Sequence, residues 1–254
     1  MRTIRVVLII AVLLATNPAK AEECRPLVKS VSIESSIRTG YLSAFGVRYS
    51  HNPVGQTSYT VTLCNGLYAN LWHSLDLKSG PNNGSGDEID ATVGWSGNLG
   101  SSGFTLDLGV THQNIPPVSR LGKEDYVSPY LELTAPEQEL GKHRLAPYVR
   151  LEVYRDMARG QTANFQPFVY LGAKHEWMLD DVWSVSQKVY GLHNPKALDL
   201  HPAFVSGYNG ALKYKLGETA TAHVPLVQMT IPLGNVRDGR KFETVVGLGI
   251  SLTF

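Results

Sequence analysis

The sequence predicts an all-β protein, a twelve-stranded antiparallel up-and-down transmembrane β-barrel. Apolar residues recur at every second position almost throughout the chain after residue 27, and this is the period of a β-strand rather than of a helix. The gaps between these segments alternate between long and short, as in outer-membrane barrels, where long loops face outward and short turns face the periplasm. The chain also ends on such a segment, VGLGISLTF, although the last residues of a soluble protein usually fray.

The N-terminal segment predicts export. MRTIR is basic, VVLIIAVLLAT is apolar, and Ala19-Lys20-Ala21 has the small-x-small form of a cleavage site, features typical of a secretory signal peptide. A membrane anchor would need roughly 20 apolar residues, whereas this run covers only residues 6–16. We expect residues 1–21 to be a cleaved signal peptide, residues 22–29 a periplasmic tail and residues 30–254 the barrel.

Composition excludes some classes of function. The chain has 23 Lys and Arg against 22 Asp and Glu, and loss of Arg2, Arg5 and Lys20 with the signal leaves 20 against 22. This balance gives no indication of a nucleic-acid partner. Two cysteines forty residues apart and scattered histidines do not form a metal-ligand pattern, so we expect no metal or other cofactor. In an exported protein the two cysteines, Cys24 and Cys64, favour a disulfide, with two free thiols as the alternative.

The strands are predicted in order along the chain. In the first, residues 30–49, one parity is apolar: Val31, Ile33, Ile37, Tyr41, Phe45, Val47 and Tyr49. The others are expected at 57–64, 67–77, 87–97, 102–113, 126–135, 143–155, 164–178, 182–192, 203–216, 222–233 and 241–254. The gaps between consecutive strands are counted from the N-terminus. Odd-numbered gaps such as KSGPNNGSG are mostly long, and even-numbered gaps such as Asn65-Gly66 and LDD are mostly short. This topology places Cys24 and Cys64 at the same, periplasmic end.

The polar parity of these strands predicts a charged lumen. Acidic residues are expected to line it from the third to sixth strands, at Asp76, Glu88, Asp90, Asp107 and Glu132. Basic residues are expected from the seventh to tenth strands, at Arg150, Lys174, Lys188, Lys213 and Lys215, with Glu152 and Glu176 as acidic exceptions. An acidic wall opposite a basic wall would orient dipolar solutes and set selectivity in a narrow pore. In the last strand Gly247, Gly249 and Ser251 add little bulk, so the open side of the pore is expected along it.

Other interpretations remain open at this stage. The lumenal charges could pair and plug a barrel of this intermediate width, and seven inward aromatic residues would narrow it further: Tyr68, Trp72, Tyr130, Tyr148, Phe168, Tyr170 and Tyr190. A non-conducting barrel could instead bind a partner through loops 113–125 and 193–202. A lipid-modifying enzyme is disfavoured because no His-x-Ser pair places both side chains on one face of a strand. A soluble exported β-protein is the alternative fold.

The terminal Ile250, Leu252 and Phe254 resemble the C-terminal signature of Gram-negative outer-membrane barrels, which implies recognition by the barrel-assembly machinery. The segments SVSIESSIRTGY, GLYANLWHSLDL, DEIDATVGWSG and FTLDLGVTHQN resemble the TorF-type porins over about 90 residues, although Arg38-Thr39-Gly40 departs from that pattern. The resemblance implies the bacterial outer membrane, with lipid and lipopolysaccharide around the barrel. It also implies passive diffusion of small hydrophilic solutes, without enzymatic activity.

Overall fold

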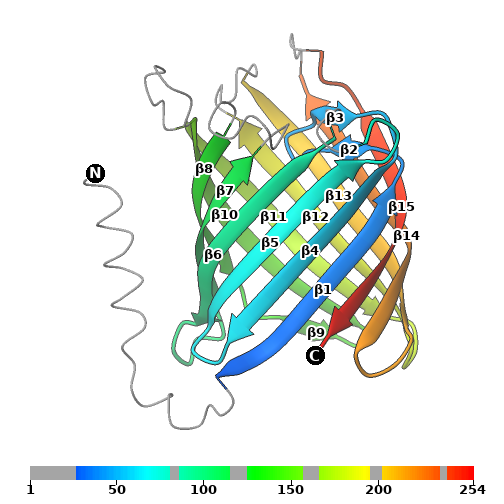
Figure 1. The fold of residues 1–254 in the computed structure, drawn as a ribbon. Coiled ribbons are helices and arrows are strands. Elements are labelled where there is room, and N and C mark those ends of the chain that lie inside the picture. Colours follow the sequence, from blue (N-terminus) through cyan, green and yellow to red (C-terminus); the bar gives the residue numbers. More distant parts are fainter. Residues whose placement is uncertain (1–26, 81–85, 115–124, 157–165, 195–201, 235–238) are drawn as a thin grey trace.

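The computed structural model describes residues 27–80, 86–114, 125–156, 166–194, 202–234 and 239–254. Within them, twelve long antiparallel strands form a closed barrel (Figure 1). These strands are β1 (Val28–Arg38), β4 (Val54–Leu63), β5 (Leu67–Asp76), β6 (Glu88–Asn98), β7 (Thr105–Asn114), β8 (Asp125–Thr134), β10 (His143–Asp156), β11 (Gln166–Met178), β12 (Trp183–Asn194), β13 (Ala203–Lys215), β14 (Ala220–Leu233) and β15 (Glu243–Thr253). The fold class and strand number predicted from the sequence are confirmed.

Each long strand pairs with its neighbour in the chain, and β15 closes the barrel against β1. At the closure the Phe254 N–H donates to the Val31 carbonyl at 2.9 Å, and the Val31 N–H donates to the Phe254 carbonyl at 3.0 Å. The last residue is therefore held by main-chain hydrogen bonds, which explains why the C-terminus continues a strand pattern to its end. In the described residues no helix is both long and apolar enough to cross a membrane.

The two faces of the sheet differ as the alternation predicts. Exposed apolar side chains cover the outside, and in β15 they are Val246, Leu248 and Ile250. The predicted lipid-facing parity of the C-terminal strand is therefore present. Short turns join the strands at the end that carries the C-terminus (Figure 1). Residues 1–26, including the predicted signal peptide and Cys24, lie outside the described residues, so their assignments stay predictions.

The first strand does not extend over residues 30–49 as predicted. β1 ends at Arg38, and the chain then folds back in a small hairpin formed by β2 (Tyr41–Leu42) and β3 (Arg48–Ser50). Gly46 allows the reversal because its φ of 84° suits glycine. We call residues 39–53 the lumenal hairpin. The alternating apolar residues of this segment pack against the inner wall instead of facing lipid, and periodicity alone cannot distinguish these two environments. A short edge strand, β9 (Gln138–Leu140), was also not predicted.

Candidate functional site: the barrel lumen

The lumenal hairpin contacts one side of the inner wall through its tip. Phe45 is 7% exposed, and its ring centroid lies 5.9 Å from that of Phe168 and 6.4 Å from that of Tyr154. The Tyr190 hydroxyl donates a hydrogen bond to the Ala44 carbonyl at 3.2 Å. These partners lie on β10, β11 and β12, so the tip of the hairpin is anchored in an aromatic cluster of that wall.

Other contacts hold the hairpin to the remaining walls. Toward β5 and β6, the Tyr41 hydroxyl donates to the Glu88 carboxylate and its ring lies 5.7 Å from that of Trp72. Toward β14 and β15, Gln228 Nε2 donates to the Leu42 carbonyl at 2.8 Å and Arg48 forms an ion pair with Glu243 at 2.9 Å. The hairpin therefore crosses the lumen at the end opposite the C-terminus and constricts it.

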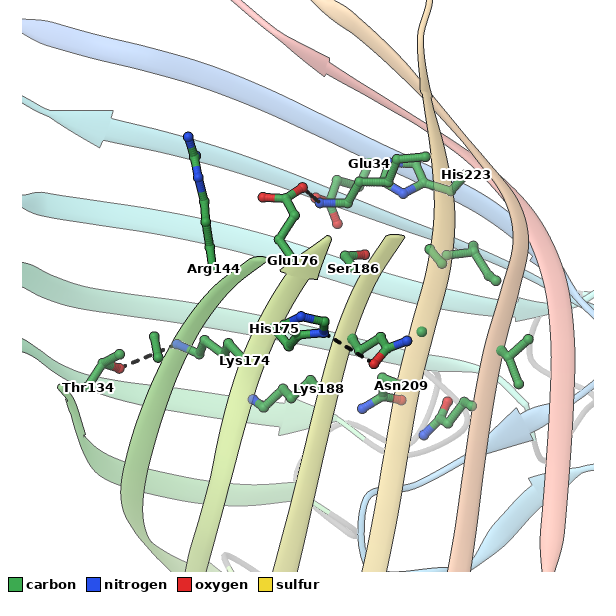
Figure 2. A pocket seen from close by; sticks show the side chains of 18 of the residues that line it. Glu34, Thr134, Arg144, Lys174, His175, Glu176, Ser186, Lys188, Asn209 and His223 are labelled. Atoms are coloured by element: carbon green, nitrogen blue, oxygen red, sulfur yellow. Dashed lines mark hydrogen bonds and ion pairs between the residues drawn. The ribbon is translucent and has the colours of Figure 1, made fainter. Parts of the chain in front are cut away.

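Beyond the hairpin the lumen holds three main cavities. The first has about 770 Å³ and is lined mainly from β1 and β10–β15, with Thr105 of β7 and Thr134 of β8 at its edge (Figure 2). The second has about 840 Å³ and is lined mainly from β4–β8, reaching the turn at Asn65. A third of about 380 Å³, the central cavity, lies against Ala44 of the hairpin. Arg150 lines the second and central cavities, and Lys188 and Asn209 line the first and central cavities. The three cavities therefore share lining residues with one another.

Ion pairs connect the acidic and basic sides at the β8–β10 seam. Glu132 binds Lys174 at 2.6 Å and Arg150 at 3.7 Å, and Arg150 also binds Glu152 at 3.2 Å. The Arg150 guanidinium lies 3.9 Å from the centroid of the Tyr130 ring. The two glutamate side chains are only 8% and 7% exposed. Removing one partner would leave a poorly solvated charge, so these pairs fix the wall in place.

The predicted acidic residues fall in three environments. Asp76 is buried and accepts hydrogen bonds from the side chains of Ser50 and Asn52 and from the N–H groups of Lys78 and Ser79. It therefore connects the end of the lumenal hairpin to the loop that follows β5. Glu88 is also buried, beneath Tyr41.

Of the remaining predicted acids, Asp107 lines the second cavity and accepts from the hydroxyls of Tyr68 and Tyr130. Asp90 lines the central cavity, and Glu132 lies in the seam. Two of the five predicted acidic residues, Asp76 and Glu88, therefore serve the hairpin and its loops.

The predicted basic residues also separate into groups. Arg150 and Lys174 belong to the seam, and Lys213 pairs with Glu176 at 3.3 Å. Lys215 is exposed at the end of β13. Lys188 faces the first and central cavities. The acidic and basic arcs therefore adjoin and neutralise each other at the seam, while Asp90 on β6 and Lys188 on β12 stand five strands apart in the barrel order.

Sequence reasoning missed a set of tyrosine–glycine pairs on the inner wall. Four tyrosines lie over the glycine directly opposite on the next strand: Tyr68 over Gly94, Tyr130 over Gly109, Tyr148 over Gly172 and Tyr190 over Gly207. A Cβ added to any of these glycines would lie 2.7 Å or less from a ring atom. The glycines thus provide space for rings that lie along the wall, an arrangement known to stabilise sheets. The register needed to find them is not visible in one sequence.

Neighbouring side chains fill part of the open space predicted beside the glycines of β15, and a cavity of about 180 Å³ still borders Gly249. A Cβ at Gly247 would lie 2.9 Å from Cγ of Arg38, and one at Gly249 would lie 2.9 Å from Cδ1 of Leu226. Side chains of β1 and β14 therefore cover these positions. Leu226 follows a break in the β13–β14 and β14–β15 register, which the alternation of the sequence does not reveal.

Two further contacts concern predictions made from sequence. His223 Nε2 and Ser251 Oγ lie 2.9 Å apart on β14 and β15, so a Ser–His contact exists across strands although no His-x-Ser motif does. The Cys64 N–H donates to the Leu27 carbonyl at 3.1 Å. This hydrogen bond brings the chain three residues after Cys24 beside Cys64, as a disulfide between the two would require.

The geometry defines a closed barrel of twelve antiparallel strands, and solved structures of proteins named as porins and channels share this fold. The KdgM porin in complex with disordered oligogalacturonate aligns with a TM-score of 0.53 and 12% identity, covering 89% of this chain and 99% of that chain. The NanC porin aligns with a TM-score of 0.53 and 12% identity over 87% of this chain and 98% of that one. The COG4313 outer membrane channel from Pseudomonas putida F1 aligns with a TM-score of 0.51 and 12% identity, covering 90% of this chain and 96% of that chain.

A family model described as "Bacterial protein of unknown function (Gcw_chp)" matches residues 28–150. The match begins at β1, contains the lumenal hairpin and ends within β10, just under half of the chain. No curated protein matches the sequence.

Proposed function

We propose that the protein is an outer-membrane channel for passive diffusion of small hydrophilic solutes, constricted by the lumenal hairpin. The observation that carries this proposal is the pair of large cavities of about 770 and 840 Å³. They lie between the lumenal hairpin and the end of the barrel that carries the C-terminus. A barrel filled by its own side chains would have little such space. The porin fold of the similar structures supports the same conclusion.

The location follows from the same features. The exposed apolar outer face suits lipid, and a cleaved signal peptide and the C-terminal Phe254 would direct the chain to the outer membrane through the barrel-assembly machinery. The tail would be pinned to the first turn by a Cys24–Cys64 disulfide. We also propose that the protein is a member of the TorF-type porins.

Selectivity would come from the hairpin and from the charges that face the cavities. The hairpin limits size, while the acidic and basic arcs act on charged or dipolar solutes. Planar-bilayer recording of folded protein tests both the conductance and its selectivity for charge. We expect a small stable conductance whose ion selectivity changes when Arg150 or Lys174 is reversed in charge, with K215Q as a control at the exposed end of β13. Absence of conductance from protein that shows the heat-shifted gel mobility of a folded barrel would refute the channel.

A non-conducting barrel that binds a surface partner is the main alternative. Its candidate loops, 113–125 and 193–202, fall mostly outside the described residues. Liposome swelling that never exceeds the rate of empty vesicles would favour it.

The His223–Ser251 contact is the one observation that favours an enzyme. A serine nucleophile also needs a group that orients the histidine and donors for an oxyanion. The acidic residue that acts on His223 is Glu34, and this interaction is electrostatic. We expect a fluorophosphonate probe to leave Ser251 unlabelled. Labelling that disappears in S251A would overturn this expectation.

A further inference from the structure

The central cavity presents two opposite charges that form no ion pair within the described residues. Its charged lining residues are Asp90, Arg150, Glu152 and Lys188. Arg150 and Glu152 neutralise each other at 3.2 Å. Asp90 and Lys188 remain, on walls five strands apart.

Lys188 belongs to a cluster with an excess of positive charge. The carboxylates of Glu132 and Glu152 act on it electrostatically, but these two carboxylates also serve Lys174 and Arg150. In the strand register Lys188 stands directly opposite Lys174, and like charges in this position repel. Lys174 has Glu132 at 2.6 Å, whereas Lys188 has no ion pair within the described part of the chain. Its ammonium lies 4.7 Å from the centroid of the Tyr148 ring. Figure 2 shows Lys174 and Lys188 side by side on neighbouring strands, with Asn209 beyond them on the next. An anionic group near Lys188 would relieve the repulsion.

The carboxyl pair of Asp90 and Glu88 provides the opposite charge. The Asp90 side chain is hydrogen-bonded to Glu88, whose carboxylate also accepts from Tyr41. Two carboxyl groups in contact share a proton, so the pair presents one negative charge rather than two. The Asp90 Oδ1 atom is buried without a hydrogen-bond partner in the described residues. A buried carboxyl oxygen without a partner calls for a hydrogen-bond donor. A cationic donor would satisfy the lone pair of this oxygen and also balance the negative charge of the Glu88–Asp90 pair.

We propose that the central cavity is a selectivity site for small zwitterions, molecules that carry both an ammonium and a carboxylate group, such as amino acids. This rests on the proposed channel function. The ammonium group would lie at Asp90 and the carboxylate at Lys188, with Asn209 and the surrounding tyrosines along the wall. The volume of about 380 Å³ is at the low end of small-molecule sites, which suits solutes of this size. A zwitterion satisfies both charges without adding net charge, whereas a simple anion or cation would meet repulsion from one wall.

Isomeric solutes test the proposal without a difference in size. Glycine and glycolamide have the same composition, but only glycine separates charge, and the same holds for 4-aminobutyrate and 4-hydroxybutanamide. Neither member carries net current, so their occupancy is measured by how much they reduce the potassium chloride current through a single channel. We expect the zwitterion of at least one pair to reduce the current at a concentration about tenfold lower than its isomer.

Variants distinguish the site from a general effect of charge. K188Q should abolish the preference for the zwitterion and shift ion selectivity toward cations. D90N alone leaves the single negative charge on Glu88, so the double variant E88Q/D90N is needed to remove it. The double variant should abolish the preference and shift ion selectivity toward anions. K188R should retain the preference, and K215Q, which removes the same charge from an exposed position, should leave it unchanged.

Three outcomes would overturn the inference while the channel stands: equal potency of both isomers, equal effects of K188Q and K215Q, or stronger block by glycolate or glycinamide than by glycine. Folded protein that conducts no ions would refute the proposed function itself.

Discussion

Phe45→Ala should convert the lumenal hairpin from a fixed constriction into a mobile one. Phe45 is 7% exposed and contacts Tyr154 and Phe168, which belong to the wall and not to the hairpin. Truncating a buried Phe to Ala costs about 3–5 kcal/mol. If this loss of free energy falls on docking of the hairpin, the ratio of undocked to docked states rises by roughly two to three and a half orders of magnitude, since 1.4 kcal/mol is a factor of ten.

Single-channel recording and polymer exclusion measure the consequence. The wild-type channel should show one small conductance, and the variant should show frequent larger openings that admit larger polyethylene glycols. Phe242→Ala is the matched control, because Phe242 is 57% exposed and the same atoms are removed. Identical current amplitude, noise and polymer cut-off in F45A and wild type would refute the role of the hairpin as the constriction.

Three further predictions concern stability and assembly. Gly109→Val should lower the free energy of unfolding by about 1–3 kcal/mol, because a Cβ there would lie 2.6 Å from the Tyr130 ring; Gly191→Ala, with nothing within 4 Å, should not. Asp180 accepts hydrogen bonds from two backbone N–H groups in the β11–β12 turn, which lowers its pKa. The contribution of these hydrogen bonds to the stability of the fold is therefore present above the ordinary Asp pKa and is lost as the pH falls through the lowered value. Asp180→Ala should lower the heat-unfolding midpoint at pH 7 and should lower it progressively less below about pH 4. A difference in midpoint that does not depend on pH would contradict this. Removal of Phe254 should reduce the yield of barrel in the outer membrane without changing export, and an unchanged yield would argue against the C-terminal signal.

Local patterning was enough to predict the wall of the barrel. A strand shows a period of two wherever one side meets lipid and the other meets polar groups. This period holds along most of the barrel strands and is broken in β14 before Leu226. The predicted strand at 67–77 corresponds to β5 at Leu67–Asp76, and the one at 203–216 to β13 at Ala203–Lys215. The outward parity of Leu248 and Ile250 was predicted for the same reason.

The contents of the lumen depended on tertiary structure. Residues 41–49 have the alternation of a strand, yet they fold inward because Phe45 finds the aromatic cluster of β10–β12 and Arg48 finds Glu243, nearly two hundred residues away. Parity could place Lys174 and Lys188 inside, but it could not show that Glu132 forms its 2.6 Å ion pair with Lys174 and not with Lys188. Which strand face a residue occupies is a local property, whereas which partner its side chain reaches depends on register and on closure of the whole barrel.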